Sequence, residues 1–228
     1  MSVSGAVIVV FAKTPRAGLV KTRMCPPLSP RQAAELYASL LDDVLETTAE
    51  LAEGLGLEPI VAVHPPEDRA EIASRAPREF RVVAQRGRDL GERMTWAAAE
   101  AAAAGARRIL LRGSDSPLLG SEQIAAALDR LAEHDLAICP DQGGGYSLIG
   151  MRRATAGLFA HPMSTRSVLE DTLANAASLG LSGSLLAPSF DLDTAEDLAR
   201  LAEARKAGDA GRCPRTLHYL DVNRFWPR

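Results

Sequence analysis

The sequence has little cysteine, no long apolar run and no strong charge of either sign. Its three cysteines, Cys25, Cys139 and Cys213, show no C-x-x-C spacing, which argues against a disulfide framework or a cysteine-rich zinc site and favours a reducing compartment. A net charge of -3 provides no overall attraction for nucleic acid or anionic lipid. The apolar run 6–12 is too short to span a bilayer and lacks the basic segment of a signal peptide. We therefore expect a cytoplasmic protein with no membrane or nucleic-acid partner.

What the sequence does contain is an alternation of short β-branched runs with longer alanine- and leucine-rich segments of helical period. Strands are expected at 6–11, 59–63, 80–84, 108–111 and 136–139, and helices at 30–53, 67–74, 92–104, 121–133, 164–179 and from 194 onward. This order predicts an α/β fold with a mostly parallel sheet. We expect one domain over residues 1–207 and a C-terminal tail, 208–228, whose Phe225 and Trp226 dock onto the body.

A basic loop, residues 11–23, follows the first expected strand, at the edge where open parallel sheets collect their ligands. Before the first acidic residue of the chain, Glu35, this loop carries four cations: Lys13, Arg16, Lys21 and Arg23. Full positive charges together with the small Gly18 suit phosphate binding, although a solvated basic loop has the same composition. The match G-L-V-K-T lacks the G-x-x-x-x-G-K-[ST] spacing, so a P-loop NTPase is disfavoured.

Two further loops place carboxylates after apolar segments. Asp115 directly follows the strand expected at 108–111, and Asp191 and Asp193 alternate around a leucine, so that both point to one side of an extended segment. Carboxylates in such positions suit Mg²⁺ or Mn²⁺, which would neutralise a diphosphate. Alternatively, Asp115 forms a turn and caps the next helix, and one of the other two serves the helix near Thr194. The residues alone leave both alternatives open.

Glycines mark two other polar turns. The segment 140–146, P-D-Q-G-G-G-Y, would let the backbone approach a sugar or base, with Tyr146 offering a stacking face and a hydroxyl. The turn 85–93 carries Arg86, Arg88 and Gly91, which could reach an anion. Solvent exposure explains the arginines of this turn equally well.

Six short segments stand in order along the chain. They are F-A-K-x-P-x-A-G-x-V-K-T-R (11–23), D-L-G-E-R-M (89–94), G-S-D-x-P-x-L (113–119), G-G-Y-x-L-I-G (144–150), S-T-x-x-V-L (164–169) and D-x-D-T-x-E-D-L (191–198). Together they resemble the DUF2064 family, which is described as glycosyltransferase-A-like and includes members named arsenosugar biosynthesis glycosyltransferases. The resemblance is collinear from about Val7 to Leu201. It implies a nucleotide-diphospho-sugar transferase fold, with a mixed, largely parallel sheet between two layers of helices.

The loops and this resemblance together define a candidate site. The nucleotide-binding candidates are Ala12, Lys13, Gly18, Lys21, Arg23, Arg86, Gly91 and Ser114. The resemblance implies a divalent metal, Mg²⁺ or Mn²⁺, on Asp115 and Asp193. The catalytic candidates are Lys21, Asp115 and Asp141, the last as a general base. The substrate-binding candidates are Gly144, Gly145, Tyr146, Ser164 and Thr165.

The chain departs from the family pattern at two positions. Gly143 stands where the pattern D-G-G-Y has a carboxylate, while Asp141 lies two residues earlier. Met163 stands where the family commonly has tryptophan, which removes an aromatic surface that could pack on a sugar or base. Both changes concern the substrate side of the expected site.

Three functions follow as hypotheses. The first is a glycosyltransferase, in which Lys21, Arg23 and the metal stabilise a departing nucleoside diphosphate while an acceptor hydroxyl attacks the sugar. The alternative is a nucleotidylyltransferase similar to the 2-phospholactate or phosphoenolpyruvate guanylyltransferases, in which a small phosphorylated acceptor attacks an NTP. The third is a degenerate nucleotide-binding protein without turnover. A homodimer is also open, since the tail around Trp226 could dock on a neighbour.

Overall fold

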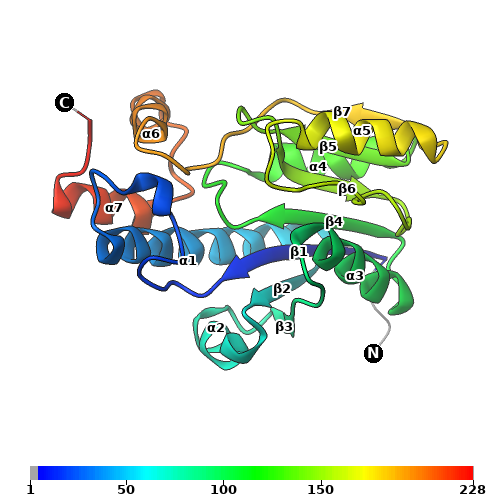
Figure 1. Ribbon diagram of the computed structural model, residues 1–228, viewed down its shortest axis with the longest axis horizontal. Helices are drawn as coiled ribbons and strands as arrows, with labels where there is room; N and C mark the ends of the chain where they lie inside the picture. Colours follow the sequence, from blue (N-terminus) through cyan, green and yellow to red (C-terminus); the bar gives the residue numbers. More distant parts are fainter. Residues whose placement is uncertain (1–4, 228) are drawn as a thin grey trace.

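Seven strands form one sheet in the order β3-β2-β1-β4-β6-β5-β7 in the computed structural model, which describes residues 5–227 (Figure 1). The strands are β1 (Ala6–Lys13), β2 (Glu58–His64), β3 (Arg81–Ala84), β4 (Arg108–Gly113), β5 (Leu136–Pro140), β6 (Tyr146–Met151) and β7 (Gly183–Leu185). Strand β6 runs antiparallel to both of its neighbours, and the other pairs are parallel. The expected mixed, mostly parallel sheet is confirmed.

Helices cover both faces of the sheet, which gives the expected three layers. Helices α1 (Pro30–Leu55) and α4 (Ser121–Arg130) pack on one face, and α3 (Leu90–Ala103) and α5 (Val168–Ser178) on the other. In β1, Val7 and Val9 join the core beneath α3, whereas Ile8 and Val10 join the cores on the opposite face. A strand buried on both faces needs a nearly continuous apolar run, and each such side chain contributes roughly 1.5–3 kcal/mol of burial.

The bounds of α1 follow from its sequence. Ser29 caps the helix in a box with Gln32, Pro30 occupies the first turn, and Gly56 ends it in a left-handed conformation with φ 66°. Shorter helices connect the other strands of this half: the 3-10 turns Thr22–Met24 and Pro66–Asp68, and α2 (Arg69–Arg75). Helices α1 and α2 lie close to their expected positions, 30–53 and 67–74, whereas the two 3-10 turns were not predicted.

The helix expected from Ser164 begins later, at Val168, and that prediction is wrong for its first turn. The N–H of Leu169 donates to the carbonyl of Gly144 (2.9 Å), which draws residues 164–167 away from the helix and across the glycine turn. The last expected helix, α6 (Asp197–Ala207), also begins late, because the Asp197 carboxylate accepts hydrogen bonds from the N–H (2.8 Å) and hydroxyl (3.0 Å) of Thr194. Asp197 therefore secures the turn before the helix.

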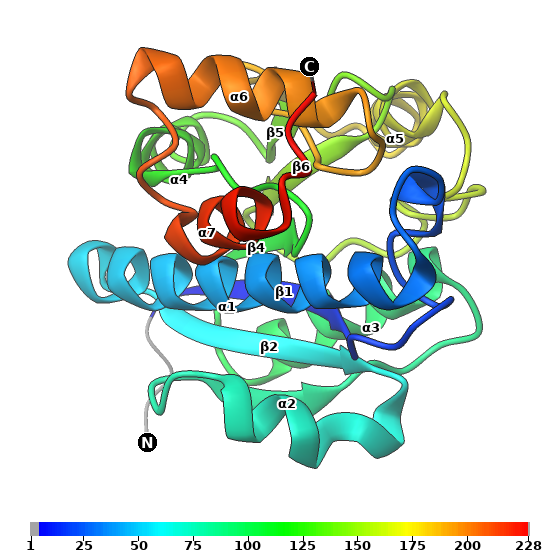
Figure 2. The same cartoon turned by 90° about the vertical axis from the view of Figure 1, so that its left-hand side faces the viewer.

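The segment 208–227 contains a helix that the sequence did not predict, α7 (Pro214–Asn223), which packs on α1 (Figure 2). Phe225 and Trp226 pack against the same core, and the Trp226 indole N–H donates to Asp221 (2.7 Å). The tail thus docks on its own chain. Among residues 5–227, no helix is long and apolar enough to cross a membrane.

Candidate active site

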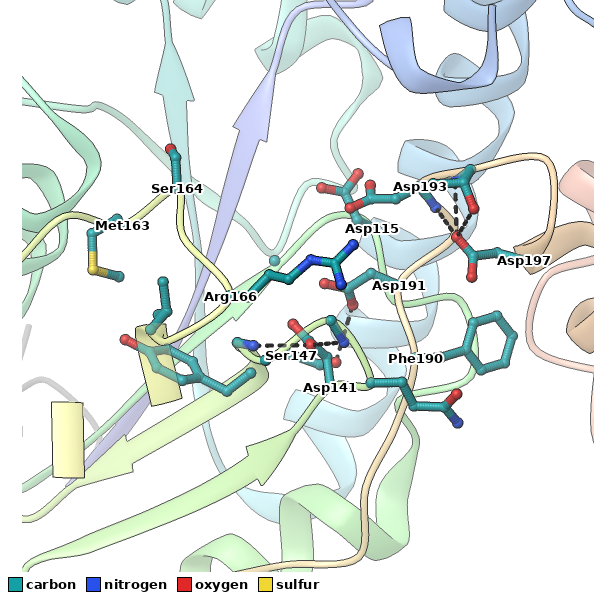
Figure 3. Close-up of a pocket in the computed structure, with 18 of the residues that line it drawn as sticks. Asp115, Asp141, Ser147, Met163, Ser164, Arg166, Phe190, Asp191, Asp193 and Asp197 are labelled. Atoms are coloured by element: carbon teal, nitrogen blue, oxygen red, sulfur yellow. Dashed lines mark hydrogen bonds between the residues drawn. The ribbon is translucent and has the colours of Figure 1, made fainter. Parts of the chain in front are cut away.

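The site lies at one edge of the sheet. Strands β1, β4 and β5 end there, and β6 begins there because it runs antiparallel to β4 and β5. The loops at this edge, with residues 163–168 and 190–200, surround a cleft of about 1180 Å³ (Figure 3). Ligand clefts of open α/β sheets are expected at this position.

A buried lysine connects two of the sheet-edge loops. The Lys21 side chain is 4% exposed, and its ammonium donates to the carboxylates of Asp115 and Asp193, the latter at 2.9 Å. It also lies 5.7 Å from the ring centroid of Tyr37. Burial alone would lower the pKa of Lys21, but the two carboxylates outweigh it and raise that pKa. The lysine is therefore a permanent positive charge that draws two acidic side chains to one point.

Asp193 has a second cationic partner, the guanidinium of Arg23. Burial would raise the pKa of Asp193, yet the charges of Lys21 and Arg23 prevail and hold it below its usual value. The fold thus brings together four predicted site residues: Lys21, Arg23, Asp115 and Asp193. Asp115 uses Oδ1 for Lys21, and within residues 5–227 its Oδ2 has no hydrogen-bond partner.

These two carboxylates fit a divalent cation of the Mg²⁺ or Mn²⁺ type. The described residues contain no cluster of three or more acidic, histidine or cysteine side chains that could hold a metal. Mg²⁺, however, is commonly bound by one or two carboxylates plus substrate phosphates and water. Asp115 and Asp193 converge on one point at the cleft and supply that minimum set.

Ser114 and Lys13 take part in a buried network beneath the cleft. The Tyr37 hydroxyl lies 2.8 Å from the Ser114 hydroxyl and accepts a hydrogen bond from the backbone N–H of Lys13 (3.0 Å). Burial raises the pKa of Tyr37 to about 12. The network joins α1 to the ends of β1 and β4, so the position of Ser114 supports the Asp115 loop from below.

Asp191 lines the same cleft as Asp193 but has different partners. Its carboxylate accepts hydrogen bonds from the hydroxyls of Ser116 and Ser147, the second at 3.0 Å. Burial, followed by the nearby charge of Asp115, raises the pKa of Asp191 to about 6. The alternation of the two aspartates predicted a shared direction, and both line the cleft; serines bind Asp191, whereas the cations Lys21 and Arg23 bind Asp193.

Arg112 is a buried cation that the sequence did not single out, because it sits at the end of an apolar strand. Its guanidinium donates to the Thr48 hydroxyl (3.0 Å) and to the carbonyls of Gly113 (3.3 Å) and Ser116 (3.1 Å). Burial lowers its pKa to about 10, so it stays charged at neutral pH. These bonds hold the loop that presents Asp115.

Asp141 closes the hairpin between β5 and β6. Its Oδ1 accepts hydrogen bonds from the N–H groups of Gly143 and Gly145, the latter at 3.0 Å. A Cβ at Gly145 would lie 2.7 Å from Asp141 Oδ2, so the glycine admits the carboxylate. Asp141 lines the cleft, and its role as a general base stays a prediction alongside this structural one.

The predicted substrate residues line the cleft together: Gly144, Gly145, Tyr146, Ser164 and Thr165. The Tyr146 hydroxyl, however, accepts from Thr172 (3.4 Å), on the α5 side. Burial raises the Tyr146 pKa to about 12. Met163 also lines the cleft, at the position where the family pattern has an aromatic side chain.

Other candidates lie outside the cleft wall. Arg86 is exposed and pairs with Glu100 on α3 (2.9 Å), and Gly91 is buried where a Cβ would come within 2.4 Å of the Phe159 carbonyl. Arg16, in the basic loop, pairs with Glu71 of α2 (2.6 Å). Ala12, Lys13 and Gly18 lie in the basic loop or at its start and do not line the cleft. The cations of this loop thus serve different partners.

The overall fold is that of nucleotide-diphospho-sugar transferases. A solved structure from Desulfovibrio desulfuricans G20, described as a candidate nucleotide-diphospho-sugar transferase, superposes with a TM-score of 0.84 and 29% identity over 99% of this chain and 100% of that one. A cytidylyltransferase from Leptospira borgpetersenii shares the fold with a TM-score of 0.60 and 13% identity, covering 97% and 95% of the two chains. The second likeness bears on the fold alone.

The chain belongs to the DUF2064 family, described as an uncharacterized protein conserved in bacteria, whose profile matches residues 47–165. It is 26% identical over 182 residues to a 2-phospho-L-lactate guanylyltransferase of Methanothermobacter thermautotrophicus, covering 79% of this chain and 78% of the relative. It is 28% identical over 197 residues to a phosphoenolpyruvate guanylyltransferase of Chloroflexus aggregans, covering 84% and 95%. These relatives are named as transferases.

Proposed function

We propose that the protein is a metal-assisted nucleotidylyltransferase that transfers a nucleoside monophosphate, GMP in the first instance, to a small phosphorylated acid. The observation that carries the proposal is the buried Lys21 held between Asp115 and Asp193, two carboxylates that line the cleft. Phosphoryl transfer depends chiefly on positioning and on charge stabilisation, which a fixed cation beside two converging carboxylates supplies. The guanylyltransferase relatives support GTP as the nucleotide.

In this reaction a phosphate oxygen of the acceptor attacks the α-phosphorus of the NTP. The new P–O bond forms as the bond between the α-phosphorus and the bridging oxygen breaks, and pyrophosphate leaves with the electron pair. Lys21 and Arg23 stabilise the negative charge of the polyphosphate as it separates. Lys21 can do so only while it stays protonated, which its two carboxylate partners ensure.

Asp115 and Asp193 are the residues that would hold Mg²⁺ or Mn²⁺, which when bound neutralises polyphosphate oxygens. Arg112 and the Tyr37–Ser114 pair keep the Asp115 loop in place for this purpose. Asp191, with its raised pKa, can hold or release a proton near neutral pH on the same wall of the cleft. Each of these tasks belongs to a side chain that faces or supports the cleft.

The second candidate is the nucleotide-sugar glycosyltransferase, which the sequence motifs place first. The naming of the D. desulfuricans structure favours it. Its reaction breaks the bond between the anomeric carbon and the diphosphate, and a nucleoside diphosphate leaves. The curated guanylyltransferase relatives favour the nucleotidylyl reaction instead.

One experiment separates these functions. The purified protein is incubated with Mg²⁺ or Mn²⁺ and each of the four NTPs, with phosphoenolpyruvate or 2-phospholactate as acceptor, and in parallel with UDP-glucose or GDP-mannose. We expect pyrophosphate release and a product heavier by one nucleoside monophosphate, detected by mass spectrometry. Release of nucleoside diphosphate from the nucleotide sugars, without pyrophosphate from NTPs, would overturn the proposal in favour of glycosyl transfer. Nucleotide binding without either product would favour the non-catalytic hypothesis.

A further inference from the structure

Four arginines line the cleft, and three of them have partners within the protein. Arg23 pairs with Asp193, Arg200 pairs with Asp197 (2.9 Å), and Arg112 donates to Thr48 and two carbonyls. Arg166 differs: across residues 5–227, it makes no hydrogen bond or ion pair. A guanidinium that faces a binding cleft with all its donors free is available to a ligand.

The Arg166 side chain extends from the loop before α5 into the cleft, toward Asp191 and Asp115 (Figure 3). The basic loop that carries Lys21 and Arg23 comes from the end of β1, a different part of the chain. Arg166 and the cations of the basic loop therefore reach the site from separate segments. One set suits the nucleotide phosphates, and the other is left for a second substrate.

The backbone beneath Arg166 is fixed even though its side chain is exposed. The Leu169 N–H donates to the Gly144 carbonyl (2.9 Å), and the Ser167 hydroxyl donates to Asp171 (2.8 Å). Gly144 has φ 90°, and a Cβ there would lie 1.9 Å from the Arg166 carbonyl. The Arg166 loop thus packs directly on the glycine turn. This close approach explains why the G-G-Y segment has a glycine at position 144.

The charge of the cleft gives Arg166 a selective role. Six carboxylates line the wall: Asp115, Asp141, Asp191, Asp193, Glu196 and Asp197. An anionic substrate would be repelled by these groups unless a cation opposed them. The two carboxylates toward which Arg166 extends each have other partners on Oδ1, Lys21 for Asp115 and two serines for Asp191. An unpaired arginine in an acidic cleft favours a ligand that brings its own negative charge.

We propose that Arg166 binds the carboxylate of the acceptor, so that the acceptor class is a small phosphorylated carboxylic acid. The inference rests on the proposed nucleotidylyl transfer. In that reaction the acceptor phosphate must approach the α-phosphorus near Lys21 and Asp115. A second anionic group is then needed to orient the acceptor, and the planar fork of a guanidinium matches a carboxylate with two parallel hydrogen bonds.

The test compares two acceptors with wild type and Arg166→Gln. 2-Phosphoglycolate carries a phosphate and a carboxylate, whereas ethyl phosphate lacks the carboxylate. We expect Arg166→Gln to raise the KM for 2-phosphoglycolate about 10- to 100-fold, with the KM for GTP and the KM for ethyl phosphate unchanged. Arg166→Lys keeps the charge but not the fork and should fall between. Arg130→Gln, an exposed arginine on α4 with no ion pair among the described residues, is the matched control.

Equal effects on both acceptors, an effect on GTP alone, or no effect would overturn the role of Arg166. A binding measurement separates this failure from failure of the proposed function. Calorimetric titration of 2-phosphoglycolate is performed with Mg²⁺ and a GTP analogue whose α–β bridge is a non-cleavable methylene. If wild type binds 2-phosphoglycolate, Arg166→Gln does not, and no acceptor is turned over, the role of Arg166 in binding stands and the proposed transfer reaction is rejected. Absence of binding by wild type would reject the carboxylate site.

Discussion

Asp43, in the middle of α1, caps the start of α7 across 173 residues of sequence. Its Oδ2 accepts hydrogen bonds from the N–H and the hydroxyl of Thr216, both at 2.8 Å, and Oδ1 accepts from the N–H of Arg215 (3.1 Å). The carboxylate is 1% exposed, and among residues 5–227 its one ion-pair partner is the Arg215 guanidinium, at 3.5 Å. The last helix of the chain is therefore anchored to the long helix of the core by one buried acidic residue.

Asp43→Ala should lower the free energy of unfolding by about 1–3 kcal/mol, because the Thr216 donors would stay buried without a partner. Urea unfolding followed by circular dichroism measures the change. Glu50→Ala, an exposed position on the same helix, is the control and should change stability by less than about 0.5 kcal/mol. Equal stability of the two variants would show that α7 does not depend on this cap.

Lys21→Met should lower kcat about 10²- to 10³-fold, since under the proposed transfer it removes the fixed charge that would stabilise the departing polyphosphate. Single-turnover assays with GTP and phosphoenolpyruvate give the chemical rate. Lys206→Met, an exposed lysine at the end of α6, serves as the matched control. Retention of wild-type kcat by Lys21→Met would remove Lys21 from the catalytic machinery.

In metal-free protein, the contribution of Asp191 to the free energy of unfolding should fall as the pH rises from about 4 to above 6. Its folded pKa, about 6, lies above the ordinary value of 3.8, so the folded state binds the proton more tightly than the unfolded state. That contribution is fully present below the unfolded pKa and is lost as the pH rises through the folded pKa. Asp191→Asn should therefore gain about 1–3 kcal/mol relative to wild type between pH 4 and pH 7. Parallel stability curves for the two proteins, measured in EDTA, would contradict this.

Iodoacetamide should label Cys25 in the native protein and spare Cys139 and Cys213. The last two are buried, and burial raises their thiol pKa to about 11 and about 12, so the reactive thiolate is scarce. Peptide mapping by mass spectrometry after labelling at pH 8 gives the three rates. Unfolding in urea should equalise them, and labelling of native Cys139 as fast as Cys25 would contradict the burial.

Gly144→Ala should raise the KM for 2-phosphoglycolate and destabilise the fold by about 1–3 kcal/mol, because the new Cβ would collide with the Arg166 carbonyl. Gly180→Ala is the matched control, since Gly180 also has a positive φ, 69°, but open space around it. The control should cost about 1 kcal/mol and leave the KM unchanged. If the two substitutions change the KM equally, the glycine turn does not determine the position of Arg166.

Much of the framework could be predicted because it depends on local rules. The buried runs of β1 and β4 are apolar on both faces, Pro30 and Gly56 bound α1, and Asp115 follows a strand whose end must lie near that of β1. These features place Lys21, Asp115 and Asp193 at one edge. The convergence of candidate residues there follows from the parallel order of the strands.

The remainder depends on contacts that spacing cannot reveal. Strand β6 was not predicted, because its run Y-S-L-I-G-M contains a serine and a glycine and directly follows three glycines, and it pairs antiparallel to β4 and β5. Likewise, the alternation of Asp191 and Asp193 gave no sign that serines would bind the first and cations the second. The free state of Arg166 is visible only when the partners of the other cleft arginines are known. The sequence thus predicts which residues meet, while their pairing is a property of the folded chain.

The hairpin formed by β5 and β6 has a consequence for how the family can diversify. The cations and Asp115 that suit the nucleotide come from residues before 116, whereas the glycine turn, Met163 and Arg166 come from residues after 139. Under the proposed function, substitutions in the glycine turn or the Arg166 loop would alter which acceptor is bound, whereas Lys21, Arg23 and Asp115 would keep their role at the triphosphate together with Asp193 from the later segment. Gly143 and Met163, which depart from the family pattern, lie in this later segment, on the side proposed to bind the acceptor.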